Sequence, residues 1–118
     1  MDDRKHVGRS GELAAWEAYR RRGYRLVARN WRCPLGELDL VVGRPGLIVF
    51  CEVKTRRPGP LGEPFEAVTP AKQRKLRKLG QAFLFAQATR PPACRFDVAS
   101  VTVDGSGRAE VQVYEDAF

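Results

Sequence analysis

The stretch GELDLVVGRPGLIVFCEVKTR, residues 36–56, decides the fold of this 118-residue chain. Residues 37–40 alternate polar and apolar side chains, and residues 47–54 are apolar on both faces until their last positions. The Arg44-Pro45-Gly46 segment between them is typical of a turn. The stretch therefore predicts two paired strands, of which the second lies in the middle of a sheet.

The flanking sequence predicts two helices and three further strands. A helix is expected over residues 10–22, with Ser10 as its N-cap and Gly23 just past its end. Thr69 followed by Pro70 predicts a second helix that continues through residue 88. Strands are expected over residues 24–31, 96–103 and 109–114, and a loop over the proline-rich residues 56–64. The expected fold is α/β, with a central mixed β-sheet flanked by helices in the order α-β-β-β-α-β-β.

Length and charge narrow the class of protein. The length predicts one domain over residues 1–118. The chain carries 21 Lys and Arg against 14 Asp and Glu, a formal charge of +7, which favours a polyanion as partner. Basic proteins are common, however, and excess charge can serve solubility alone. Composition by itself therefore leaves the function open.

The cysteines and the hydropathy pattern indicate the compartment. Cys33, Cys51 and Cys94 are far apart and lack the short spacing of a zinc site, so we expect three free thiols in a reducing environment. The first eight residues are charged, and no apolar run is long enough to span a bilayer. We expect a cytoplasmic protein without a membrane partner.

Polar residues in the two central strands carry the candidate chemistry. Residues two apart in a strand share a face, so Glu52 and Lys54 should lie together, and so should Glu37 and Asp39 on the neighbouring strand. Buried carboxylates repel one another unless a cation balances them. Lys54 supplies one charge, and oxygen ligands are those that Mg²⁺ or Mn²⁺ selects. We therefore expect a divalent-metal site, with a strand-end ion pair between Glu52 and Lys54 as the alternative.

The first predicted helix adds a third acidic residue. Glu12 precedes Trp16 by four residues and Tyr19 by seven, so helical periodicity turns it inward with these aromatic residues. An inward carboxylate fits a place at the same metal site. The alternative is that Glu12 only satisfies the start of the helix.

Glu12, Asp39 and the Glu52-Val53-Lys54 segment together resemble the motif of the PD-(D/E)XK nuclease superfamily, in particular its archaeal Holliday-junction resolvases. One departure is that the superfamily's proline-aspartate pair is Leu38-Asp39 here. A closer resemblance, covering nearly the whole chain, is to the bacterial YraN family. It rests on the segments Gly11-Glu12, Gly23-Tyr24, Asn30-Trp31, Gly36-Glu37-Leu38-Asp39-Leu40, Phe50-Cys51-Glu52-Val53-Lys54-Thr55-Arg56, Gly62, Glu66-Ala67-Val68-Thr69 and Lys72-Gln73-Arg74.

This resemblance implies a three-layer fold of the restriction-endonuclease type and a Mg²⁺- or Mn²⁺-dependent nuclease. Asp39, Glu52 and the Val53 carbonyl would be metal ligands, and Glu12 an outer or third carboxylate. Lys54 would orient the attacking water or stabilise negative charge during phosphodiester hydrolysis. Whether Glu37 binds metal is left open.

Basic residues near the second predicted helix predict a surface that tracks a phosphate backbone. Lys72 should project toward the sheet from the first helical turn, where the helix dipole favours a phosphate. The alternative is an ordinary solvated helix face. Trp31 and Phe65 are weak candidates for stacking on an unpaired base. The candidate nucleic-acid-binding residues are Arg56, Arg57, Lys72, Gln73, Arg74, Lys75, Arg77 and Lys78.

Three functions are compatible with the sequence. The first is a nuclease acting on DNA rather than RNA, on branched or flapped substrates in repair, recombination or DNA uptake, as a monomer or homodimer. The second is a non-catalytic nucleic-acid-binding module that retains the fold. The third is a structural adaptor whose acidic cluster is an ion-pair network.

Overall fold

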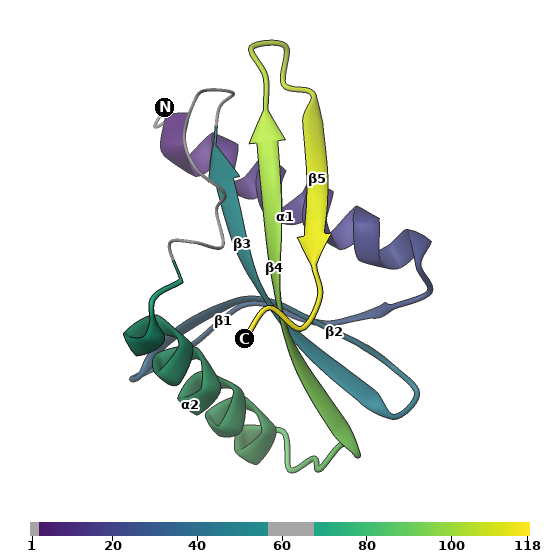
Figure 1. Ribbon diagram of the computed structural model, residues 1–118, viewed down its shortest axis with the longest axis vertical. Helices are drawn as coiled ribbons and strands as arrows, with labels where there is room; N and C mark the ends of the chain where they lie inside the picture. Colours follow the sequence, from purple (N-terminus) through teal and green to yellow (C-terminus); the bar gives the residue numbers. More distant parts are fainter. Residues whose placement is uncertain (1–2, 57–67) are drawn as a thin grey trace.

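The computed structural model describes residues 3–56 and 68–118, in which two helices flank a five-stranded sheet (Figure 1). The elements are α1 (Asp3–Arg21), β1 (Arg25–Cys33), β2 (Gly36–Arg44), β3 (Leu47–Arg56), α2 (Pro70–Ala86), β4 (Ala93–Val103) and β5 (Ala109–Tyr114). The predicted α/β class and the order of elements are confirmed.

The sheet has the strand order β1-β2-β3-β4-β5. β3 pairs with β4 in parallel, and the other three pairs are antiparallel. The mixed sheet and the central place of β3 therefore follow the prediction. A parallel pair needs a long connection, and the segment containing α2 provides it by linking β3 to β4.

Each helix covers one face of the sheet, which gives three layers. Adjacent residues of a strand face opposite sides, so Val49 and Phe50 of β3 belong to different cores. The core beneath α1 includes Ala15, Tyr19, Leu40, Val42, Val49 and Cys51. The core beneath α2 includes Leu38, Val41, Ile48, Phe50, Leu79 and Phe83. In Figure 1, α1 crosses behind β3, β4 and β5, while α2 lies on the near side.

The helix boundaries differ from those predicted. α1 begins at Asp3, seven residues before the expected cap at Ser10, because an interior Gly8 costs a helix only about 1 kcal/mol and does not end it. α2 ends at Ala86, and Ala88 has a positive φ of 52°. Within the described residues, no helix is long and apolar enough to cross a membrane.

The first strand contains an irregularity that the sequence did not predict. β1 runs to Cys33, and its pairing with β2 shifts between Leu26 and Ala28. Such a bulge inserts one residue and reverses which face the following side chains take. Leu26, which precedes the shift, is 41% exposed, whereas Ala28, which follows it, packs against the core beneath α2. Strand β4 also starts earlier than predicted, at Ala93.

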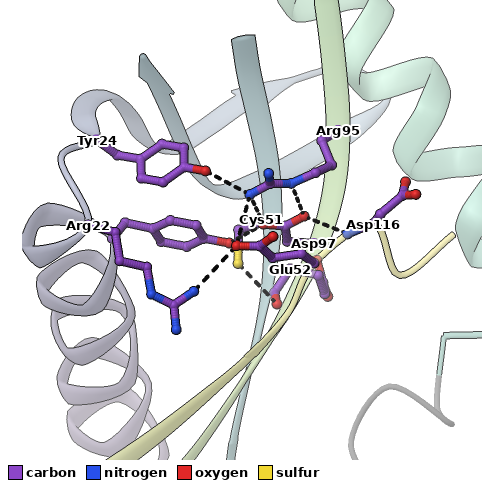
Figure 2. A network of polar contacts seen from close by, with 9 residues as sticks. Arg22, Tyr24, Cys51, Glu52, Arg95, Asp97 and Asp116 are labelled. Carbon is purple, nitrogen blue, oxygen red and sulfur yellow. Dashed lines mark hydrogen bonds and ion pairs between the residues drawn. The ribbon is translucent and has the colours of Figure 1, made fainter.

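A buried carboxylate ties the α1 layer to the sheet. Asp97 of β4 is fully buried and accepts hydrogen bonds from the Tyr19 hydroxyl at 2.7 Å and the Asp116 backbone N–H at 3.0 Å. The Arg95 guanidinium donates two more, at 2.8 and 2.9 Å. Arg95 also donates to the Tyr24 hydroxyl at 3.0 Å, as Figure 2 shows. Asp97 therefore has four donors, including a cation, and its charge is balanced within the fold.

Removing one of these donors should destabilise the protein. Tyr19→Phe leaves the Asp97 carboxylate short of one buried hydrogen bond, which should lower the free energy of unfolding by about 1–3 kcal/mol. Asp97→Ala leaves Arg95 without its partner and should cost more, about 3–5 kcal/mol. Urea denaturation followed by circular dichroism measures both. An unfolding free energy for Tyr19→Phe equal to that of the wild type would show that this network does not hold α1.

Candidate active site

The strands β2 and β3 separate at the residues that were predicted to carry the chemistry. Their ladder runs from the Arg44–Leu47 pair to the Leu40–Cys51 pair. Beyond that point, the Val53 backbone N–H donates to Asp39 Oδ2 at 2.9 Å, while β3 stays paired with β4 up to Arg56. A side-chain carboxylate therefore replaces a backbone carbonyl as the acceptor, which places Asp39 between the two strands.

A cavity of about 170 Å³ lies beside this point, between the sheet and α2. Its sheet side carries three carboxylates, Glu37, Asp39 and Glu52. Its α2 side is lined by Lys72, Lys75, Leu76 and Leu79. The fold thus brings Asp39 and Glu52 to one cavity whose acidic side faces a basic side.

The end of β2 departs from strict strand alternation. Strict alternation places Leu38 with Leu40, away from α2. The structure instead packs Leu38 with Leu79 beneath α2, and Leu40 beneath α1. At residues 36–38, β2 pairs with β1, whereas its ladder with β3 starts only at Leu40. The end of β2 is therefore free to turn relative to β3, and a period-two pattern cannot describe it.

The carboxylates at the cavity differ in how their charge is balanced, and Asp39 has no ion-pair partner among the described residues. Burial and the charge of Glu52 together raise the pKa of Asp39 from its usual 3.8 to about 7, although the hydrogen bond from Val53 opposes this shift. Glu12 and Glu37 add to the same shift. Lys54 Nζ lies 3.4 Å from Glu52 Oε1, with both side chains largely buried. One lysine therefore offsets Glu52, while Asp39 stays uncompensated.

Glu12 reaches the site from the α1 side. Its charge raises the pKa of Asp39, although α1 and α2 cover opposite faces of the sheet. Gly11 allows this approach, because a Cβ at residue 11 would overlap the Thr55 hydroxyl of β3. Among the described residues, no three Asp, Glu, His or Cys side chains form a group that would hold a metal ion by themselves. Glu12 thus acts on Asp39 from a distance here.

Two lysines of α2 are positioned by local structure. The Lys72 backbone N–H donates to the Thr69 hydroxyl at 3.2 Å, which fixes the first turn of α2 as the sequence predicted. The neighbouring Lys54 ammonium group lowers the pKa of Lys72. The Lys75 side chain crosses Gly36, where an added Cβ would lie 3.2 Å from Lys75 Cε. Sequence reasoning gave Gly36 no such role.

The other predicted binding residues of α2 differ in their contacts within the chain. The Gln73 amide donates to the Val68 carbonyl at 3.1 Å. The Arg77 guanidinium stacks on Phe96, 5.1 Å from the ring centre. Both side chains therefore have partners within the chain. Arg74 and Lys78 are exposed on α2.

The remaining sequence candidates lie elsewhere. Arg56 is half-buried at the end of β3. The Trp31 ring is half-buried and packs edge-on against Phe83 of the core beneath α2, with centroids 5.3 Å apart. Arg57, Phe65 and most of the predicted proline-rich loop fall outside the described residues.

The raised pKa of Asp39 predicts a stability that depends on pH. Between pH 3.8 and about 7 the folded protein holds a proton that the unfolded chain has released. The contribution of Asp39 to stability is therefore greatest at low pH and falls as the pH rises toward 7. Urea denaturation in EDTA at about pH 5 and pH 8 measures this, and Asp39→Asn should remove that part of the pH dependence. Identical pH profiles for the two proteins would contradict the shift.

The comparisons with known proteins agree with one another. A family model described as "Uncharacterised protein family UPF0102" matches residues 11–101. The chain is 46% identical over 114 residues to a UPF0102 protein of Symbiobacterium thermophilum, with 97% of each chain covered. It is 41% identical over 116 residues to one of Moorella thermoacetica, covering 98% of this chain and 97% of the relative.

A third relative, a UPF0102 protein of Kineococcus radiotolerans, is 44% identical over 107 residues, covering 90% of this chain and 88% of its own. The residues that line the cavity, from Glu37 to Leu79, all lie within the stretch that the family model matches. The cavity is therefore formed by the part of the chain that aligns with the family. The chain belongs to the UPF0102 family, which is the YraN family that its sequence resembles.

Proposed function

We propose that this protein is a Mg²⁺- or Mn²⁺-dependent nuclease that hydrolyses phosphodiester bonds of DNA, with branched or flapped molecules as substrates. The observation that carries the proposal is the cavity whose acidic side, Asp39 and Glu52, faces the cationic side chains of Lys72 and Lys75. A cation and a phosphate bound side by side would match these two sides. The net charge of +7 favours a polyanionic substrate.

The residues present fit a hard divalent cation. Mg²⁺ commonly binds through one or two carboxylates and completes its shell with waters and substrate phosphates, so Asp39 and Glu52 suffice without a third carboxylate. The raised pKa of Asp39 also supports this assignment, because burial and the nearby charge of Glu52 disfavour the ionised carboxylate, and a bound cation would offset both effects. Glu12 would tune Asp39 through its charge. The Val53 carbonyl remains a proposed ligand.

The side chains at the cavity would have separate roles in hydrolysis. Asp39 and Glu52 would hold the cation, which when bound supplies Lewis-acid polarisation of the phosphate. Water forms the new bond to phosphorus as the bond to the leaving oxygen breaks. Lys54, next to Glu52 at 3.4 Å, would donate hydrogen bonds to the phosphate oxygens as their negative charge grows. Lys72 would orient the phosphate from the other side of the cavity.

A binding module without catalysis is the second candidate. It is favoured by the Glu52–Lys54 ion pair, which satisfies Glu52 within the chain, and by the lack of a three-ligand cluster among the described residues. Such a module would bind nucleic acid through the same cations and cut nothing. Cleavage assays on linear, flapped and four-way DNA with Mg²⁺ or Mn²⁺ separate the two.

Substitutions that change charge but keep shape test the site. Asp39→Asn and Glu52→Gln should each weaken Mn²⁺ binding, measured by calorimetry, because an amide oxygen is a poorer ligand for a hard cation. Lys54→Ala should leave Mn²⁺ binding intact or tighter and lower the cleavage rate by on the order of a hundredfold. Glu110→Gln, an exposed position on the edge strand β5, is the matched control.

These variants also show which part of the proposal fails. If the folded Lys54→Ala protein cleaves DNA at the wild-type rate, Lys54 has no catalytic role. If the wild type cuts none of the DNA substrates but binds them, the binding module replaces the nuclease. Circular dichroism and a DNA titration show that each variant still folds and binds.

Binding to duplex DNA should weaken steeply with salt. If about four to six phosphates are neutralised, log K should fall with log salt at a slope of roughly −4 to −5. Removing the two exposed cations in Arg74→Ala/Lys78→Ala should reduce the slope by about two, because each phosphate contact contributes about one. Fluorescence anisotropy over a range of NaCl concentrations measures it. A flat response would exclude backbone binding.

A further inference from the structure

The outward face of α2 carries a straight row of side chains that the cavity does not use. At 100° per residue, Arg74, Lys78 and Phe85 fall within about 40° of one line. They point away from the buried face, which Leu79 and Phe83 define. We call these three residues the α2 ridge. All three are exposed.

Phe85 is unusual among the described aromatic residues. It is 89% exposed, whereas Phe50, Phe83 and Phe96 pack against other rings of the core. A lone exposed apolar residue needs no explanation in itself. Phe85, however, stands at the end of a helix whose sequence holds five Lys and Arg and no Asp or Glu. An aromatic ring in line with cations is the composition of surfaces that bind unpaired nucleic acid.

We infer that the α2 ridge binds an unpaired nucleic-acid strand, with a base stacked on Phe85 and phosphates on Lys78 and Arg74. Every base has a π-face, so stacking on Phe85 needs no particular sequence. In a duplex the bases already stack on one another, so Phe85 gains a partner only where a strand is unpaired. The positive ridge complements a polyanion and would repel a basic one.

The ridge leads to the cavity. Lys75, and then Lys72, lie progressively further around α2 from the ridge, and both line the cavity opposite its acidic side. Thirteen residues separate Lys72 from Phe85, which is about 20 Å along the helix axis. A strand held by Phe85 therefore reaches the cavity after a few nucleotides. This inference rests on the proposed function in taking nucleic acid as substrate, and it names the substrate class as nucleic acid with a single-stranded segment beside the cut.

The test compares affinities without metal. A labelled oligothymidylate of about 20 nucleotides and a duplex of the same length are titrated in EDTA, followed by fluorescence anisotropy. Phe85→Ala should lower the ratio of single-strand to duplex affinity by about 5- to 100-fold, the effect of losing one stacked base. Phe85→Trp should keep the ratio, because indole also stacks. Phe85→Leu, apolar but not aromatic, should lower it as alanine does.

Three results would overturn the inference. They are an unchanged ratio for Phe85→Ala with no change in self-association, a wild-type ratio for Phe85→Leu, or an unchanged ratio for Phe85→Ala together with loss of a self-association that the wild type shows in sedimentation. The last result would make the ridge an interface between two copies. This test measures binding and not cleavage. If the cleavage assays find the wild type inactive but the affinity ratio still depends on Phe85, the proposed chemistry is refuted and this inference stands.

Discussion

The hydrogen bond from the Val53 N–H to Asp39, 2.9 Å long, is the constraint on which the cavity depends. It lets β2 part from β3 after the Leu40–Cys51 pair without leaving that N–H unsatisfied. The parting gives the Asp39 carboxylate a place between the strands, and Glu52 follows on the same side. A continuous ladder would bury these positions against neighbouring backbone and close the cavity.

Two carboxylates of this fold, the buried Asp97 and the half-buried Asp39, differ in how their charge is compensated. Asp97 receives four hydrogen bonds, two of them from Arg95, and joins α1 to the sheet. Asp39 receives one from the Val53 backbone N–H, and burial together with the charge of Glu52 raises its pKa. A satisfied carboxylate stabilises the fold. An uncompensated one is costly for the fold and suits the binding of a cation.

Helical geometry places the basic side chains of α2 on different faces of the helix. Lys72 and Lys75 turn toward the cavity, Arg77 stacks on Phe96, and Arg74 and Lys78 stand on the outer ridge. A run of basic residues in the sequence thus serves different faces of the helix. If the proposed function holds, the cavity-facing lysines would act on the phosphate that is cut, and the ridge would hold the strand next to it.

Local pattern in the sequence determined the order of elements, the central place of β3 and the pairing of Glu52 with Lys54, because period and turn residues are local properties. It also singled out Asp39. Only the tertiary structure decided that β2 leaves β3 at Asp39, that Gly11 lets α1 approach Thr55, and that Asp97 gathers four donors. These features join residues distant in the chain, and no periodicity encodes which side chain replaces a missing ladder partner.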